Sequence, residues 1–212
     1  MAIQQKLETP TPPNLGYPPE LYDRRNFNES NGALNVYFRK VTSVLGALFG
    51  VKGSRYINAP YGAFQSTADQ TAAAINTAYA MTFNTTDYTN GVTVASNSRI
   101  TVTDSGIYNL QWSGQFENTD SQDHDARIWI KVNGTNLVGS TGFVGIPSKH
   151  GSVNGHTIVA WNYFLSLDAT DYVELWWETD STTVSIQAYA AASNYPSTAS
   201  LIATMQFVSN TM

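Results

Sequence analysis

The chain has 212 residues and a net charge of −5, and only 13% of its residues are charged. Lysine and arginine form no cluster, which argues against nucleic acid or an anionic membrane as a partner. Cysteine is absent, so disulfides and thiolate metal sites are excluded. No segment approaches the roughly 18 apolar residues of a membrane span. Because the opening MAIQQKLETP also lacks the apolar core of a signal peptide, we expect synthesis and folding in the cytoplasm.

Residues 1–22 are predicted to form an extended, proline-rich arm. Proline fixes φ and removes a backbone donor, so a segment with this composition does not fold alone. Two interpretations stay open: a disordered tail, or an anchor that becomes ordered on the surface of a partner. In the second interpretation the anchor residues are Pro10, Pro12, Pro13, Tyr17, Pro18 and Pro19.

Residues 23–50 are predicted to form a short helical stalk. Six apolar residues and one asparagine follow one another at alternating spacings of four and three, which is the a/d repeat of a coiled coil. This seam consists of Phe27, Asn31, Leu34, Phe38, Val41, Leu45 and Leu48. A helix this short, interrupted by Gly32 and Gly46, is marginal alone, so it packs on its own domain or associates with copies of itself. The narrow, regular seam favours self-association, with Asn31 setting the register.

Residues 51–212 are predicted to form an all-β domain. After a glycine-marked break, β-branched and aromatic side chains alternate with polar ones, and turn residues recur about every dozen positions. The clearest alternating segments are 108–116, 126–132, 159–167, 172–178, 184–188 and 201–207, with shorter ones at 79–83, 91–94 and 99–102. Asn133-Gly134 is a strong hairpin signal. About eight to ten strands are expected, the size of a β-sandwich or jelly roll.

Several large aromatic residues have the parity of the solvent face of their strands. These residues are Trp129, Tyr172, Trp176 and Tyr189. Exposed rings usually mark an interface, so either neighbouring subunits cover them or a ligand stacks on them. The seam in residues 23–50 makes subunit contact the simpler explanation.

The sequence offers no convincing catalytic centre, metal site or cofactor site. His150 and His156 lie six residues apart in a glycine-rich loop, a spacing that fixes no metal geometry. Glu174 and Glu178 share one face of a strand, as the two carboxylates of a glycosidase could. Ordinary surface carboxylates beside exposed aromatics explain the pair equally well. The acidic loop 117–125 is rich in oxygen ligands yet lacks the glycine and final glutamate of an EF-hand, so calcium there stays an open alternative. We therefore predict a protein that is not an enzyme.

Three stretches together carry a resemblance to a known family: SGIYNLQWSGQF, ARIWIKVNG and VAWNYFLSLDATDYVELWW. They resemble the trimeric jelly-roll domains of the tumour necrosis factor and complement globular-head superfamily, in the form common among structural proteins of tailed phages, of the marine or cyanophage type. The matching positions are Gly106, Tyr108, Asn133, Gly134, Leu165, Leu167, Asp171, Tyr172, Val173 and Leu175, and the segment Arg55 to Thr71 resembles the start of this phage-type domain. One departure is Thr170, which replaces a usual glycine. The resemblance covers about two thirds of the chain, and its motifs carry fold better than function.

The resemblance implies a homotrimer around a threefold axis. Combined with the seam, it predicts an N-terminal anchor arm, a trimerising stalk and a C-terminal knob, which is the layout of a virion fibre or decoration protein. Made in the host cytoplasm, such a protein is expected on the virion, bound to a capsid or tail protein. Two rival functions remain: a receptor-binding knob whose loops 117–125 and 146–156 grip a host surface glycan, and a polysaccharide-degrading tail enzyme with a site between subunits.

Overall fold

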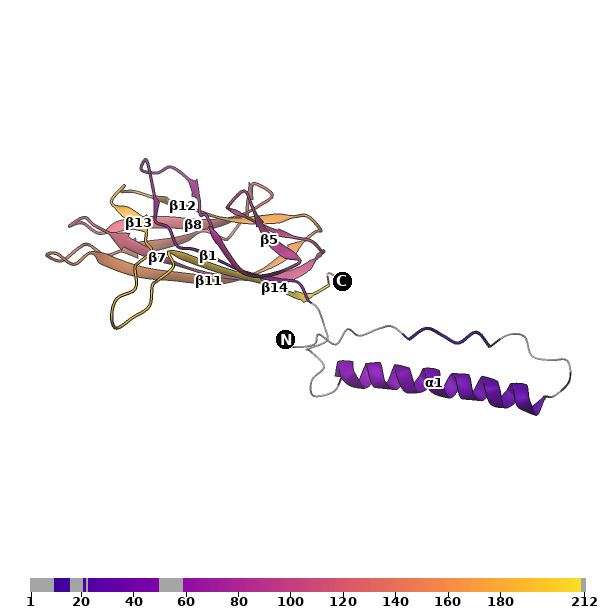
Figure 1. The fold of residues 1–212 in the computed structure, drawn as a ribbon. Coiled ribbons are helices and arrows are strands. Elements are labelled where there is room, and N and C mark those ends of the chain that lie inside the picture. Colours follow the sequence, from indigo (N-terminus) through magenta and orange to yellow (C-terminus); the bar gives the residue numbers. More distant parts are fainter. Residues whose placement is uncertain (1–9, 16–20, 22, 50–58, 211–212) are drawn as a thin grey trace. The chain divides into compact units, whose positions relative to one another are not determined.

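The structure is a computed structural model that describes residues 10–15, 21, 23–49 and 59–210 (Figure 1). Contacts divide the chain into two compact units, Met1–Asn58 and Ala59–Met212. Of the anchor residues, Pro10, Pro12 and Pro13 lie in a described segment without helix or strand, whereas positions 17–19 lie outside the described residues. Within the residues that the structure describes, no helix is long and apolar enough to cross a membrane.

The first unit contains helix α1 (Arg24–Phe49), as the seam predicted. Asp23 caps its start: its Oδ1 accepts the backbone N–H of Arg25 at 2.9 Å, and its carbonyl oxygen accepts that of Phe27 at 3.0 Å. Arg25 and Glu29 form an exposed i, i+4 ion pair at 2.9 Å. Such an exposed pair contributes only a few tenths of a kcal/mol to the stability of this helix.

The second unit is a sandwich of two antiparallel sheets, which confirms the all-β class. Sheet A has the order β2 (Gln70–Thr71), β13 (Val184–Ile186), β7 (Gly106–Asn118), β14 (Leu201–Ser209), β1 (Tyr61–Ser66), β4 (Thr85–Asn90), with β11 (Gly155–Leu167) also paired to β7. Sheet B has the order β10 (Gly142–Ile146), β8 (His124–Val132), β12 (Tyr172–Thr179), β6 (Arg99–Val102), β5 (Val92–Ala95), with β3 (Tyr79–Ala80) paired to β12 and β9 (Thr135–Asn136) paired to β8.

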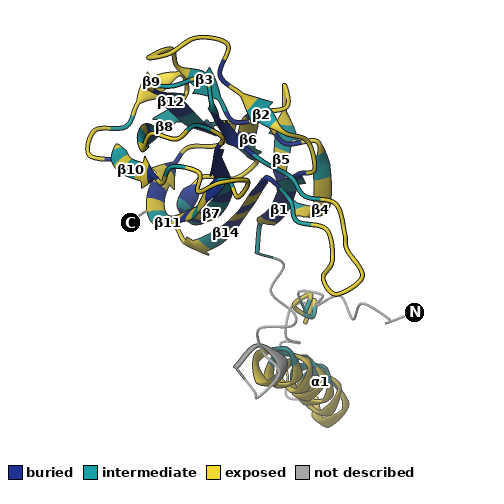
Figure 2. Cartoon of the chain, turned by 90° about the vertical axis from the view of Figure 1, so that its left-hand side faces the viewer, coloured by how far each residue is buried: buried dark blue, intermediate teal, exposed yellow. Residues whose placement is uncertain are grey.

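The core lies between the two sheets and is built from alternate residues of each strand (Figure 2). On β7 the predicted inward set is buried: Tyr108, Leu110, Trp112 and Phe116. From the opposite sheet, Trp177 packs edge-on against Phe116 with ring centres 5.9 Å apart. Because these rings belong to β12 and β7, this contact ties sheet B to sheet A.

One side of the sandwich is closed where β11 meets β10. The ring of Trp161 lies so close to Gly142 that a Cβ at this glycine would sit 1.9 Å from Cη2 of the ring. The hydroxyl of Tyr163 donates to the carbonyl oxygen of Ser140 at 3.1 Å. Only glycine therefore fits at position 142, and the two edge strands pack side chain against backbone.

Two turns contain residues with positive φ, one without strain and one with it. Asn133 and Gly134 have φ of 50° and 78°, as a two-residue hairpin of type I′ requires. Thr170, at the position where the family resemblance expects glycine, has φ of 74°. A β-branched residue is disfavoured in this left-handed region, so threonine at position 170 makes the fold less stable than glycine would.

Several strands were not predicted from the sequence, and the predicted end of the strand at residues 184–188 was wrong. β4 (TTDYTN) is polar and lies at the edge of sheet A, and β10 (GFVGI) is short and contains two glycines. Neither shows the alternation expected of a half-buried strand. The strand predicted to run through Ala188 ends at Ile186, because the chain there leaves the sheet and starts a hairpin.

Candidate functional site

The seam predicted for association lies on α1 from Phe27 to Leu48. Phe38 is 59% exposed and Leu45 is 45% exposed, while Leu34 and Val41 are half-buried. Leu48 lies within the helix, but its side chain is outside the described residues. Large apolar side chains left this open on a helix are typical of an interface with another chain.

A second open surface is the outer face of three adjacent strands of sheet A, which we call the A face. Its residues point away from the core and carry no formal charge. They are Asn109, Gln111, Ser113 and Gln115 of β7, Ile158, Ala160, Asn162 and Phe164 of β11, and Ile202, Thr204 and Gln206 of β14. Ile158 is 67% exposed and Phe164 is 64% exposed. Charged residues are depleted at the centres of protein interfaces and apolar ones are enriched there, so this face has the composition of an interface.

The three aromatic residues predicted on the outer face of sheet B are half-buried, and two of them, Tyr172 and Trp176, are covered by cations. Trp129 and Trp176 are directly opposite each other on β8 and β12. Lys131 Nζ lies 3.5 Å from the centre of the Trp176 ring, and Arg99 Cζ lies 4.6 Å from the centre of the Tyr172 ring. Because these two ring faces are occupied by cations of the same chain, they offer less surface to a stacking ligand than their parity alone indicates.

Glu174 is a buried carboxylate on this same face. Ser98 Oγ donates to its Oε1 at 2.7 Å, and Trp176 Nε1 approaches its Oε2 at 3.4 Å. Arg99 Nε lies 3.6 Å from Oε1. A charge removed from water needs such partners, so Glu174 holds β6 against β12 as a structural group.

Tyr189, the fourth predicted aromatic, lies away from the other three. Its hydroxyl donates to Glu117 Oε2 at 2.8 Å and lies 3.1 Å from His156 Nδ1. Burial raises the pKa of Tyr189, and the hydrogen bond to Glu117 adds to this effect. Tyr189 therefore fastens the segment that follows β13 onto the ends of β7 and β11.

Three loops meet around Asn118 at this end of the sandwich. Its Nδ2 donates to the carbonyl oxygens of Gln122 at 2.7 Å and Pro147 at 3.2 Å. Its Oδ1 accepts the backbone N–H of Asp120 at 2.9 Å and the hydroxyl of Thr183 at 3.2 Å. A single fully buried amide thus satisfies four hydrogen bonds and joins loops that are distant in sequence.

The acidic loop 117–125 is organised by hydrogen bonds to its carboxylates. His124 lies between one carboxylate of this loop and one that directly follows β12, with Nε2 3.0 Å from Asp120 Oδ2 and Nδ1 3.2 Å from Asp180 Oδ1. The hydrogen bond from His124 lowers the pKa of Asp120, and the backbone N–H of Ser148 lowers that of Asp123. Across the described ranges, no group of three or more His, Cys, Asp or Glu side chains has an arrangement that would hold a metal ion.

The glycosidase alternative receives no geometric support from the predicted pair. Glu174 is hydrogen-bonded to Ser98 and Trp176 as described above, and Glu178 accepts a hydrogen bond from Arg127 Nη1 at 2.9 Å. His150 begins a tight turn in which its backbone N–H and carbonyl oxygen pair with those of Val153. Both carboxylates are thus held by partners of the same chain, whereas a two-carboxylate mechanism needs them facing a bound sugar.

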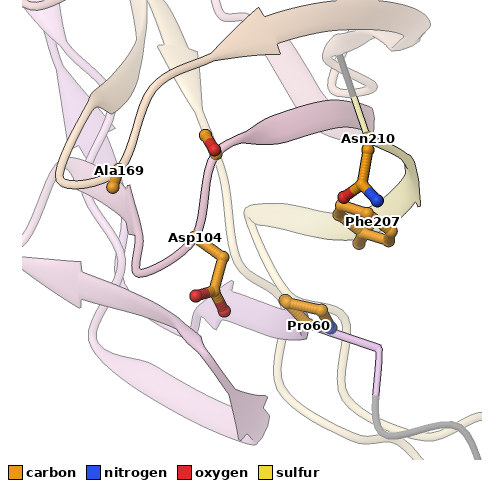
Figure 3. A pocket seen from close by; sticks show the side chains of 6 residues that line it. Pro60, Asp104, Ala169, Phe207 and Asn210 are labelled. Atoms are coloured by element: carbon orange, nitrogen blue, oxygen red, sulfur yellow. The ribbon is translucent and has the colours of Figure 1, made fainter. Parts of the chain in front are cut away.

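A hollow of about 460 Å³ at the opposite end of the sandwich contains one ionisable group (Figure 3). It is lined by Pro60, Asp104, Ser105, Ala169, Phe207 and Asn210. Asp104 projects from the turn between β6 and β7, while Phe207 and Asn210 belong to the C-terminal end of β14 and the residues beyond it. Among these lining residues no second ionisable side chain accompanies the Asp104 carboxylate, so they supply no acid–base pair.

No protein-family model matches the chain, and no curated protein matches it either. The seam, the A face and the loops described above are therefore the features of the molecule that point to a function.

Proposed function

We propose that this chain is a structural protein of a tailed-phage virion, a homotrimeric fibre or decoration protein. The N-terminal arm attaches it to a capsid or tail protein, α1 forms a three-helix stalk, and the β-sandwich is displayed as a knob. Its work is binding and assembly, with no chemical step. Threefold display lets weak contacts of each knob act together.

The observation that carries this proposal is the pair of uncovered surfaces. The seam on α1 leaves Phe38 and Leu45 exposed, and the A face leaves Ile158 and Phe164 exposed. A closed ring of identical subunits buries such surfaces in every copy. Since one lies on a helix and the other on a sheet, association through both makes stalk and knob members of one trimer.

We also propose that the sandwich is a jelly roll. The order β11-β7-β14-β1 in one sheet and β10-β8-β12-β6 in the other brings the first and last long strands side by side. This order supports the family resemblance carried by the motifs in residues 106–175, and two packed sheets of this kind are common in virion proteins.

The stalk is tested by replacing Leu34, Phe38 and Val41 together with glutamine. The expected result is a shift from trimer to smaller species in sedimentation equilibrium, because the a/d contacts are lost. The matched control is Val36→Gln, since Val36 is 55% exposed on the same helix but lies outside the seam. An unchanged trimer mass in the triple variant would contradict the stalk.

The anchor is tested by deleting residues 1–20. The shortened protein is expected to remain a trimer but to be missing from virions, as judged by immunogold labelling of intact particles. The same images of the full chain locate the attachment point on head or tail. Normal incorporation of the shortened protein would contradict the anchor.

A further inference from the structure

The segment between β13 and β14 forms a hairpin, residues 187–200, that leaves sheet A. The backbone N–H groups and carbonyl oxygens of Tyr189 and Thr198 pair with each other at 3.0 and 2.8 Å. Nearer the tip, the N–H of Ala192 donates to the carbonyl oxygen of Tyr195 at 3.0 Å. In Figure 1 this hairpin, coloured gold, extends past sheet A on the side away from sheet B.

The base of the hairpin is fixed firmly to the sandwich. The hydroxyl of Tyr189 is bonded to Glu117, and the backbone N–H of Ala188 donates to Asp69 Oδ1 at 2.9 Å. On the return strand, Ser200 Oγ donates to the carbonyl oxygen of Ala68 at 2.6 Å. These contacts come from β7 and from the loop after β1, so they set the direction in which the hairpin leaves the sheet.

The tip, by contrast, is open along its whole length. All residues from 190 to 197 are exposed, and Tyr195 is 52% exposed. The sequence AAASNYPS contains no charged residue. A two-stranded hairpin is marginally stable in water by itself, so an ordered tip gains stability when a surface covers it.

We propose that in the trimer this tip lies on the A face of the neighbouring subunit. The inference rests on the proposed trimer and adds the contact by which its knobs are joined. A ring of three copies needs two different surfaces on each subunit, one that reaches out and one that receives. The hairpin is a preformed projection, and the A face is an uncovered surface.

The composition of the two surfaces selects a second copy of this chain as the occupant. Neither the tip nor the A face carries a charge, whereas the outer face of sheet B carries Arg99, Arg127, Lys131 and Glu178. Burying uncharged surfaces against each other avoids the desolvation cost of charges. The alanines of the tip allow close approach, and Tyr195 supplies the kind of ring that contributes strongly to interfaces.

The absence of cysteine makes a cross-linking test direct. Three double variants of the full chain combine Tyr195→Cys at the tip with Ile158→Cys, Phe164→Cys or Ile202→Cys on the A face. After mild oxidation, at least one is expected to give disulfide-linked dimers and trimers on a non-reducing gel. The matched control combines Tyr195→Cys with Phe143→Cys, an exposed ring on the outer face of sheet B, and is expected to stay uncross-linked.

Sedimentation of the same samples separates the two ways in which this inference fails. A trimer mass with no cross-link from the tip to any A-face position overturns the hairpin contact and leaves the trimer standing. A monomer mass overturns both. A disulfide within one chain, seen as a monomer band of altered mobility, shows that the tip folds onto its own A face and also overturns the contact.

A milder variant tests the energetic role of the tip without new cysteines. Tyr195→Ala is expected to raise the dissociation constant of the trimer roughly tenfold, because an aromatic anchor is lost. Val138→Ala, at a fully exposed loop residue elsewhere on the sandwich, is expected to leave it unchanged. Thermal unfolding confirms that both variants are folded, and equal dissociation constants would overturn the proposal.

Discussion

The ammonium nitrogen of Lys131 lies 3.5 Å from the centre of the Trp176 ring. Both residues belong to the outer face of sheet B, where Arg99 covers Tyr172 in the same way. These rings thus find partners within their own chain. The exposed apolar residues of the A face have no comparable cover among the described residues, and so the two faces of the sandwich are suited to different roles.

The Lys131 contact should contribute measurably to stability. Replacing Lys131 with methionine keeps the aliphatic stem but removes the cation, and the free energy of unfolding is expected to fall by about 0.5–1 kcal/mol in urea denaturation. Lys131→Arg retains a cation over the ring and is expected to stay near the original value. Equal stability of the methionine variant would show that the contact is energetically neutral.

Removing the buried Glu174 carboxylate should cost more. In Glu174→Ala, the hydroxyl of Ser98 loses its acceptor and Arg99 loses a partner, so unfolding is expected to become easier by about 3 kcal/mol. Glu178→Ala is the matched control on the same strand. Its ion pair with Arg127 is partly exposed, and we expect a loss below about 1 kcal/mol. Similar losses in the two variants would contradict the structural role given to Glu174.

Thr170 offers a substitution that should stabilise the protein. Its φ of 74° is open to glycine without strain, so Thr170→Gly is expected to raise the free energy of unfolding by about 1 kcal/mol, seen as a higher melting temperature. Thr135→Gly, in the short strand β9, is expected to have the opposite sign because glycine weakens strands. A destabilised Thr170→Gly variant would mean that the threonine side chain makes a contribution larger than the backbone strain.

Much of the sandwich was predictable because its long strands obey a simple alternation. Tyr108 to Phe116 and Leu201 to Met205 were assigned to the core by parity, and burial confirms them. β4 and β10 were not predicted from the sequence. Both are edge strands, which bury few side chains, so their residues are not constrained to alternate between apolar and polar. Parity also marked Trp129 and Trp176 as outward but gave no sign of the cations over the Trp176 and Tyr172 rings, which come from neighbouring strands.

The pH dependence of stability should reveal the hydrogen bonds in the acidic loop. The pKa of Asp120 is lowered in the folded state, mainly by His124, so ionised Asp120 stabilises the fold above the ordinary aspartate range. This contribution is lost as the pH falls below about 4 and the folded-state carboxylate becomes protonated. Asp120→Asn is therefore expected to flatten the decline of the unfolding midpoint with acidification.

A double-mutant cycle identifies the partner responsible. If His124 is the main cause of the lowered pKa, Asp120→Asn and His124→Gln together should alter the acid limb no more than either alone. Additive changes would assign the effect to the backbone N–H of Ser121 instead. Both variants leave Asn118 intact, so the loop remains attached to its neighbours.

The candidate assembly surface was harder to predict than the fold. On β11, Val159 and Leu165 were correctly assigned to the core, but the outward Ile158 and Phe164 are equally apolar and were not recognised as part of an open surface. The hairpin 187–200 was missed because Ala188 continues the alternation of β13. Its departure from the sheet depends on Tyr189 reaching Glu117, a contact across 72 positions of sequence.

All five tryptophans, at positions 112, 129, 161, 176 and 177, lie in the sandwich, and the unit that contains α1 has none. Intrinsic tryptophan fluorescence therefore reports on the sandwich alone, whereas helical circular dichroism reports largely on α1. Monitored together during heating, the two signals would separate melting of α1 from melting of the sandwich in the unmodified protein. If α1 melts first, in a concentration-dependent transition, the fluorescence stays unchanged until the sandwich itself unfolds.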